Sequence, residues 1–208
     1  FRGLAAYQTQ DFTGAKNYGT VVLSAQPANG PALLLTGAAN FALNANEQAL
    51  ALLRPYMGQF PGDDRGRRIL GATLLRLGQS QEALKVLQPL ADKSVDDAEL
   101  LAMIGTAAVR TGDTVVARKA LQQVAKLRPG SGEAMAQLGA ISLQSGDTTQ
   151  AIKDLEQALQ QDPNLDRALA GIALAHVQAG DFDKALEAAQ RLRDKAPEQA
   201  AGATLLGI

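Results

Sequence analysis

Few residues of this chain could take part in chemistry. His176 is the only histidine, and the chain has no cysteine and no GxSxG sequence, so these residues cannot form a nucleophile and base triad. One histidine without cysteine also excludes a structural zinc site. We expect His176 to be a packed, hydrogen-bonded core residue, and we predict no catalytic residue, no metal and no cofactor. Enzymatic activity would require a catalytic domain elsewhere in a longer protein.

Two further features resemble ligand-binding or catalytic motifs. The Gly-Ser-Gly run at 130–132 begins like a phosphate-binding loop, but neither a GK[ST] ending nor the third glycine of a dinucleotide motif follows. The acidic pairs Asp63-Asp64 and Asp96-Asp97 each stand at the start of a predicted first helix, with Asp63 and Asp97 one 34-residue period apart. Carboxylates there cap the helix and interact favourably with its dipole. We therefore expect turn and capping roles for these residues.

The elements that position these side chains follow from a period of 34 residues. Three sets of residues recur at this interval, and we call each set a column. One column is alanine, the second is a small residue always twelve positions before the alanine, and the third is mostly proline. The columns are Ala15, Ala49, Ala83, Ala117, Ala151 and Ala185; Gly3, Gly37, Gly71, Gly105, Gly139, Ala173 and Gly207; and Pro27, Pro61, Val95, Pro129, Pro163 and Pro197. Unrelated helices would drift out of phase, so three columns in one register indicate a repeat array.

Each repeat is predicted to be a pair of helices. Apolar residues recur at helical spacing, and the small residues let the two helices approach closely. Between the helices stand Gly78, Gly112, Gly146 and Gly180. Glycine accepts the positive φ that ends a helix, and the proline ends the second helix. Ser131, Asn164 and the Asp96-Asp97 pair are expected to cap the helix that follows.

With this length and these columns, the chain resembles tetratricopeptide repeat proteins, most clearly at 132–163 and 166–197. The resemblance implies an all-α fold: an α-solenoid of antiparallel helix pairs forming a superhelix of about six 34-residue repeats. A single array would cover the whole chain, with a partial repeat at 1–29, repeats at 30–63, 64–97, 98–131, 132–165 and 166–199, and the start of another at 200–208. The aromatic residues usual at positions 4 and 11 of the family, counting Asp166 as position 1, are absent, which indicates a divergent array.

Both ends of the chain fall inside predicted first helices. Phe1 is position 6 of a repeat and Ile208 is position 9 of another. Solenoids normally finish with a polar capping repeat, whereas this chain ends on the core-facing run Leu205 to Gly207. We therefore expect the chain to be a fragment of a larger protein.

A narrower resemblance concerns the stretches 31–63 and 67–90. They resemble the tetratricopeptide protein encoded with the bacterial PEP-CTERM/exosortase system. That resemblance implies a lipoprotein associated with exopolysaccharide production and the sorting of surface proteins, and hence a periplasmic or envelope-anchored location. The absence of cysteine fits both a periplasm and a reducing cytosol, so the cytoplasm stays an alternative.

Composition narrows the classes of partner. The 208 residues are 46% hydrophobic and 20% charged, which suits one elongated soluble unit. Net charge is -1 and the charges are interspersed, whereas a nucleic-acid partner would require a basic stripe. No apolar run approaches the roughly 20 residues of a membrane span. We predict no nucleic-acid partner and no transmembrane segment in this chain.

Function is therefore expected on the solenoid surface. In the repeats that the chain resembles, first helices line a concave groove, into which positions 2, 5, 9, 12 and 13 point. The candidate binding residues at these positions are Tyr7, Phe41, Arg65, Arg68, Arg76, Thr106, Arg110, Gln144 and Gln178. The arginines offer acidic-group recognition, and Tyr7 and Phe41 offer aromatic contact to a peptide or helix. The alternatives are a solvated face for the arginines and inter-repeat packing for the aromatic pair.

We predict a non-catalytic protein-protein interaction scaffold, with a protein or peptide in the concave groove, in an envelope-associated assembly linked to exopolysaccharide. The family's clamp for a C-terminal carboxylate requires Lys and Asn at positions 5 and 9, and the groove has neither. The alternative is a carbohydrate-binding module, with a polysaccharide partner. A sugar site would require exposed aromatic platforms and a fan of Asn, Asp or Gln, of which the predicted groove has few.

Overall fold

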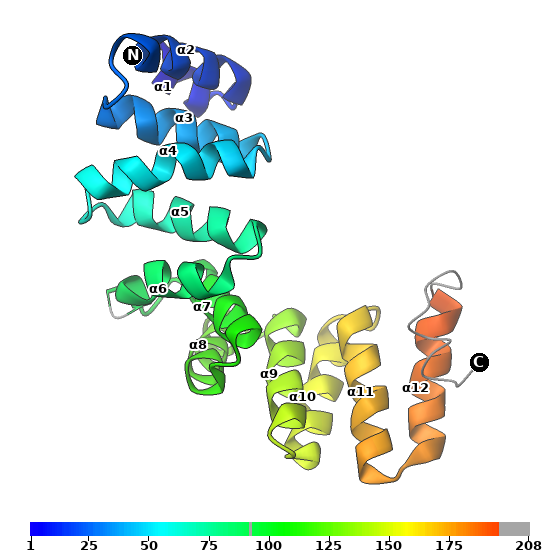
Figure 1. Cartoon of the computed structure of the whole chain (residues 1–208). Coiled ribbons are helices and arrows are strands. Elements are labelled where there is room, and N and C mark those ends of the chain that lie inside the picture. Colours follow the sequence, from blue (N-terminus) through cyan, green and yellow to red (C-terminus); the bar gives the residue numbers. More distant parts are fainter. Residues whose placement is uncertain (92, 196–208) are drawn as a thin grey trace. The chain divides into compact units, whose positions relative to one another are not determined.

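In the computed structural model, residues 1–91 and 93–195 are described, and their regular structure is entirely helical. Consecutive helices are joined by short turns (Figure 1). The helices are α1 (Arg2–Gln8), α2 (Phe12–Ala25), α3 (Gly30–Ala42), α4 (Asn46–Gln59), α5 (Asp64–Arg76), α6 (Ser80–Ala91), α7 (Ala98–Thr111), α8 (Thr114–Leu127), α9 (Gly132–Gln144), α10 (Thr148–Gln161), α11 (Asp166–Ala179) and α12 (Phe182–Lys195). The predicted all-α helical-repeat architecture is confirmed.

The helices belong to two compact units. Unit 1 contains residues 1–95 and 106–111, and unit 2 contains residues 96–105 and those from 112 onward. Within unit 1, α3 packs against α2 and α4, and α5 packs against α4 and α6. Within unit 2, α9 packs against α8 and α10, and α11 packs against α10 and α12. The single array over 1–208 stays a prediction, and its last segment, 200–208, lies outside the described residues.

The alanine column forms the centre of each helix pair. Ala15, Ala49, Ala83, Ala117 and Ala151 are completely buried, and Ala185 is 6% exposed. Each stands in the first half of a second helix, where a larger side chain would push the neighbouring helix away. The periodic alanine is therefore a close-packing residue in both units, as its spacing predicts.

The glycine column is explained by a column of leucines, whose contact with the glycines the sequence analysis did not predict. A Cβ added to these glycines would meet a leucine of the paired helix at 2.3–2.9 Å, closer than real Cβ contacts come. The pairs are Gly37 with Leu53, Gly71 with Leu87, Gly105 with Leu121 and Gly139 with Leu155. In the next repeat Ala173 replaces the glycine, and the buried residue at the leucine position is Ala189. Gly207 lies outside the described residues.

The turns inside the helix pairs have one backbone geometry. Gly78, Gly112, Gly146 and Gly180 have φ between +73° and +79°, as predicted from their place after the first helix. In the first two repeats, Gln10 and Asn44 occupy this position with φ of +62° and +59°. The turn therefore has the left-handed conformation even where the residue is not glycine, at a steric cost that glycine avoids.

Prolines mark the ends of the second helices. Four of these helices, α2, α4, α8 and α10, end two residues before Pro27, Pro61, Pro129 and Pro163. The residue before each proline has ψ between 63° and 95°, away from the helical region, as expected before proline. Val95 replaces proline after α6, which ends earlier, at Ala91. Pro197 lies outside the described residues.

Two of the three predicted caps are present. The side chain of Ser131 accepts a hydrogen bond from the Ala134 N–H at 3.4 Å, and Asp97 Oδ1 accepts one from the Leu100 N–H at 2.9 Å. The cap expected from Asn164 is wrong. The N-cap residue of α11 is Leu165, which makes no side-chain cap, because the helix begins one residue later than the sequence pattern suggests.

Candidate functional site

The single histidine lies in the core of unit 2, as expected. His176 of α11 is 6% exposed. Its Nδ1 makes no hydrogen bond and lies 3.5 Å from the Asp181 carboxylate, so the expected hydrogen bond is missing on this nitrogen. No cluster of three or more His, Cys, Asp or Glu that could hold a metal occurs within residues 1–91 and 93–195.

Asp63 caps α5 and also binds a buried tyrosine. Its carboxylate accepts hydrogen bonds from the Gly66 N–H at 3.0 Å, the Arg65 N–H at 3.2 Å and the Tyr56 hydroxyl at 2.7 Å. Burial alone would raise the pKa of Asp63, but these hydrogen bonds outweigh it and lower the pKa below the ordinary value. Burial, followed by the bond to Asp63, raises the pKa of Tyr56 to about 12.

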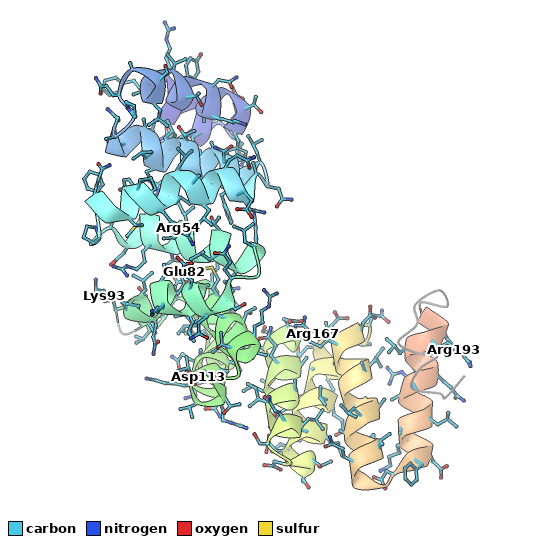
Figure 2. The ribbon with its side chains drawn as sticks, viewed as in Figure 1. Arg54, Glu82, Lys93, Asp113, Arg167 and Arg193 are labelled. Atoms are coloured by element: carbon cyan, nitrogen blue, oxygen red, sulfur yellow. The ribbon has the colours of Figure 1, made fainter. Side chains whose placement is uncertain are left out.

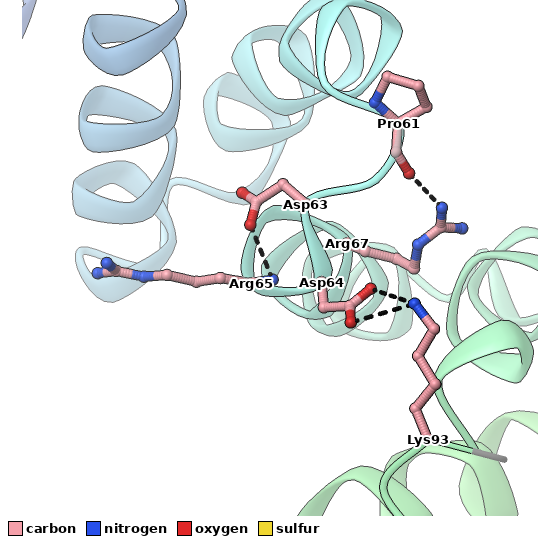
Figure 3. A network of polar contacts seen from close by, with 6 residues as sticks. All are labelled: Pro61, Asp63, Asp64, Arg65, Arg67 and Lys93. Carbon is pink, nitrogen blue, oxygen red and sulfur yellow. Dashed lines mark hydrogen bonds and ion pairs between the residues drawn. The ribbon is translucent and has the colours of Figure 1, made fainter.

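The neighbouring carboxylate, Asp64, pairs with a lysine from the end of the same repeat. Lys93 Nζ lies 3.3 Å from both Asp64 carboxylate oxygens, and the Arg67 guanidinium donates to the Pro61 carbonyl. Figure 3 shows the Asp64 carboxylate directed at Lys93, while the Arg65 side chain extends away from both. The acidic pair is therefore fully engaged within the chain, and the Arg65 guanidinium is not part of this network.

A pocket of about 420 Å³ in unit 1 brings predicted groove residues together. It is lined by Tyr7, Asp64, Arg65, Arg68, Ile69, Leu90 and Ser94. Tyr7 belongs to α1, whereas Arg65 and Arg68 lie one turn apart on α5. Both α1 and α5 pack against α3. Three of the nine candidate residues, almost sixty positions apart in the sequence, therefore share one site.

Phe41, Arg76 and Arg110 form a second arrangement in unit 1. The Arg76 guanidinium lies 3.7 Å from the Phe41 ring centroid, and its Nη1 donates to the Phe41 carbonyl at 2.7 Å. One repeat later, Arg110 Nη1 donates to the Leu75 carbonyl at 3.1 Å. The last carbonyls of a helix lack intrahelical partners, so these arginines cap the preceding first helices, α3 and α5. Sequence reasoning missed this role, although the 35-residue spacing repeats.

The remaining candidates lie apart from the pocket. Thr106 of α7 is half-buried, and in unit 2 Gln144 of α9 and Gln178 of α11 are exposed. On the first helices of unit 2, Arg167 pairs with Glu133, which also accepts a hydrogen bond from Gln137 at 2.8 Å. In Figure 2, Arg167 lies on the side of α11 that faces α9. These first helices therefore present glutamines and a neutralised ion pair.

A second pocket of about 420 Å³ lies in unit 2, between α10, α11 and α12. It is lined by Glu156, Leu159, Gln160, Ile172, His176, Lys184, Glu187, Ala188 and Arg191. Acidic and basic side chains are balanced there, so its charge favours no particular ligand. Among the helices of the described residues, none combines the length and apolarity that crossing a membrane requires.

Comparison with solved structures supports the same fold. A crystal structure of MamA superposes with a TM-score of 0.71 at 21% identity, over 82% of this chain and 93% of MamA. The protein YrrB, described as a TPR protein with an unusual peptide-binding site, gives 0.73 at 18% identity, over 91% and 98%. A thermophilic TPR protein from Thermus thermophilus gives 0.63 at 21%, over 86% and 100%.

Comparison with family models identifies the repeat. Two models described as tetratricopeptide repeat match the chain, one at 142–207 and the other at 70–131 and 102–166. Together they cover 70–207, well over half of the sequence. No curated protein sequence matches the chain. The matched residues hold the buried alanine and glycine columns of both units, and the chain belongs to the tetratricopeptide repeat family.

Proposed function

We propose that the chain is a non-catalytic scaffold that binds a protein or peptide through the first-helix face of unit 1. We define this face as the exposed surface of α1, α3 and α5 around Tyr7, Arg65 and Arg68. The tetratricopeptide fold supports protein-protein interaction. The single observation that carries the proposal is the pocket in which Tyr7 of α1 joins Arg65 and Arg68 of α5.

Helix packing alone does not explain this set of side chains. Arg65 is exposed and Tyr7 and Arg68 are half-buried, so the pocket offers the phenol of Tyr7 and the guanidinium of Arg65 to a ligand. Hydrogen-bond donors beside an apolar wall are typical of sites that bind peptide segments. YrrB, which shares the fold, is described as having a peptide-binding site, and this supports the same class of ligand here.

We also propose that the scaffold acts in a bacterial envelope assembly linked to exopolysaccharide and PEP-CTERM sorting. The support is the sequence resemblance at 31–63 and 67–90. Carbohydrate binding stays a prediction from the sequence. A periplasmic or envelope-anchored location likewise stays a proposal, which localisation of the tagged protein in the native cell would test.

Photo-cross-linking tests the proposed binding face. A photo-reactive phenylalanine analogue replaces Leu4, which is 48% exposed beside Tyr7 on α1. A matched control carries the analogue at Val115 of α8, which is 79% exposed on a second helix. We expect one defined protein adduct from Leu4, identified by mass spectrometry and competed by the unmodified chain. Equal adducts at both positions would contradict the proposed face, and binding to a glycan array alone would favour the carbohydrate alternative.

A further inference from the structure

We propose that the pocket of unit 1 binds the side-chain carboxylate of an internal Asp or Glu in the partner segment. The inference rests on the proposed function and names the chemistry of its ligand. The donors that would hold the carboxylate are the Tyr7 hydroxyl and the Arg65 guanidinium, and Arg68 lines the same pocket. Arginine binds carboxylates through two parallel N–H donors, which gives geometric selectivity as well as affinity.

The first step concerns which arginines are engaged elsewhere. Arg54 bonds Glu82 at 2.7 Å, and Arg76 and Arg110 bond backbone carbonyls. By contrast, within the described residues no hydrogen bond or ion pair engages the Arg65 guanidinium. Its backbone N–H is bound by Asp63, which fixes the start of the helix and leaves the side chain to project outward. Arg65 is therefore placed to meet a ligand.

The second step concerns the negative charges beside the pocket. Asp63 is held by Tyr56 and two N–H groups, and Asp64 is paired with Lys93. Neither carboxylate is paired with the Arg65 guanidinium, and Figure 3 shows the Asp64 carboxylate turned away from it. The Arg65 guanidinium is consequently not held in an ion pair and attracts an anion that comes from outside the chain.

The third step distinguishes a carboxylate from a phosphate. One guanidinium, that of Arg65, balances the single negative charge of a carboxylate. A phosphoryl group carries about -1.5 to -2 charges at neutral pH, so it would leave excess negative charge beside Asp64, which also lines the pocket, and uncompensated charge is costly beside apolar walls. Ile69 and Leu90 also line the pocket, so we expect an apolar residue beside the acidic one in the partner segment.

Peptide binding to the whole chain tests the inference. The probe is dye-labelled acetyl-Gly-Leu-Glu-Leu-Gly-amide, and its fluorescence anisotropy is followed during titration. We expect the glutamine analogue to bind about tenfold more weakly, because each charge-assisted hydrogen bond contributes more than a neutral one. Two further probes carry phosphoserine in place of Glu, or glutamine with a free C-terminal carboxylate, and both should bind more weakly than the Glu peptide.

Matched variants show where binding occurs. Arg65→Gln should weaken binding of the Glu peptide about tenfold, and Tyr7→Phe should weaken it less. Arg167→Gln is the control, because Arg167 has the same repeat position in unit 2 but is paired with Glu133; it should leave binding unchanged. Circular dichroism confirms that these surface variants are folded.

Several results would overturn the inference. Among the peptides, these results are equal binding of the Glu and Gln peptides, no measurable binding of any peptide, or tighter binding of the phosphoserine or free-carboxylate probe than of the Glu peptide. Among the variants, the contradicting result is an equal loss of affinity for the Glu peptide in Arg65→Gln and Arg167→Gln. The proposed scaffold function fails separately. It fails if Leu4 cross-links no defined protein, whereas a specific Leu4 adduct together with indifference to the Glu side chain would reject only the carboxylate inference.

Discussion

The first helices of the two units share the same buried columns but carry different exposed chemistry. In unit 1, Arg76 and Arg110 cap the preceding first helix, and Arg65 and Arg68 line a pocket. In unit 2, the positions of Arg76 and Arg110 are taken by Gln144 and Gln178, and Arg167 is neutralised by Glu133. Buried positions therefore define the fold of each repeat, while exposed positions on the same helices vary and determine what a unit can bind.

The largest effects are expected from the shared core. Gly71→Ala in unit 1 and Gly139→Ala in unit 2 place a Cβ 2.3 Å and 2.5 Å from leucine carbons of the paired helix. Each should lower the free energy of unfolding by about 1–3 kcal/mol, because the packed leucine must shift. Urea denaturation followed by circular dichroism measures both losses of unfolding free energy. The two losses should be similar if the two units share the same helix packing.

A glycine without close neighbours provides the control. An added Cβ at Gly58 in α4 meets no atom within 4 Å, so Gly58→Ala should be neutral or should stabilise by up to about 1 kcal/mol. The double variant Gly71→Ala with Leu87→Ala should lose less than the sum of the single losses, because the alanine removes the clash. Equal destabilisation at Gly58 and Gly71 would contradict the steric account.

The second prediction concerns the cap that is specific to unit 1. Tyr56→Phe removes the hydroxyl that donates to Asp63 at 2.7 Å and should cost about 1.5 kcal/mol, the lower end of the range for hydrogen bonds to charged groups, because Asp63 keeps its two N–H donors. The pKa of Tyr56 is raised from 10.0 to about 12, so its contribution is complete below pH 10 and is lost as pH rises through 12. Denaturation measured at several alkaline pH values should show this loss in the native chain and not in the variant.

The same cap predicts a dependence on acid. Because the pKa of Asp63 is lowered from 3.8, its contribution is present above that value and is lost as pH falls through the lower pKa of the folded state. Asp63→Asn should reduce this loss. An unchanged acid profile would show that the cap and the Tyr56 bond do not stabilise unit 1.

A smaller effect is expected at the turns that lack glycine. Gln10 has φ of +62° where four later repeats have glycine. Gln10→Gly should therefore stabilise by about 1 kcal/mol by removing the left-handed strain, while Gly112→Ala should cost a similar amount. Thermal unfolding measures both changes, and a loss of stability in Gln10→Gly would contradict the shared turn geometry.

The smallest effect is expected from a buried acid of unit 2. Burial raises the pKa of Asp154, and the hydrogen bond from Gln150 at 2.6 Å opposes this only in part. A raised pKa favours the folded state at low pH, and this advantage is lost as pH rises from 3.8 through the higher pKa of the folded state. Relative to the native chain, the Asp154→Asn variant should therefore have a higher free energy of unfolding at pH 7 than at pH 3. The difference between the two pH values should be less than about 1 kcal/mol. No difference between the two pH values would contradict this.

Sequence periodicity predicts the fold well because close packing constrains residue size at fixed intervals. The alanine column, the glycine turns and the proline stops all lie where the 34-residue register puts them. The pairing of leucines with the glycines was not predicted, because leucine is common at many helical positions and its partner is visible only in three dimensions. The predicted cap at Asn164 was wrong. Asn is a frequent N-cap residue, but α11 begins at Asp166 and its N-cap residue is Leu165.

The candidate site was predicted less completely. The resemblance to tetratricopeptide repeats implied that Tyr7, Arg65 and Arg68 belong to one face, and the structure places them in one pocket. The resemblance could not show that Arg76 and Arg110 bond to carbonyls of the preceding repeat, because the acceptors are backbone atoms with no signature in the residue type. The pairing of Asp64 with Lys93 likewise depends on the path of the chain after α6.

Mapping the bound Glu peptide by amide chemical shifts tests the central claim most directly. The central claim is that the two units share the same buried packing, whereas only the first-helix face of unit 1 binds the acidic segment. Titration of the isotopically labelled chain should shift the amide signals of Tyr7, Arg65 and Arg68 and leave those of Gln144 and Gln178 unchanged. Shifts centred on Gln144 and Gln178, or equal shifts on both faces, would contradict the claim.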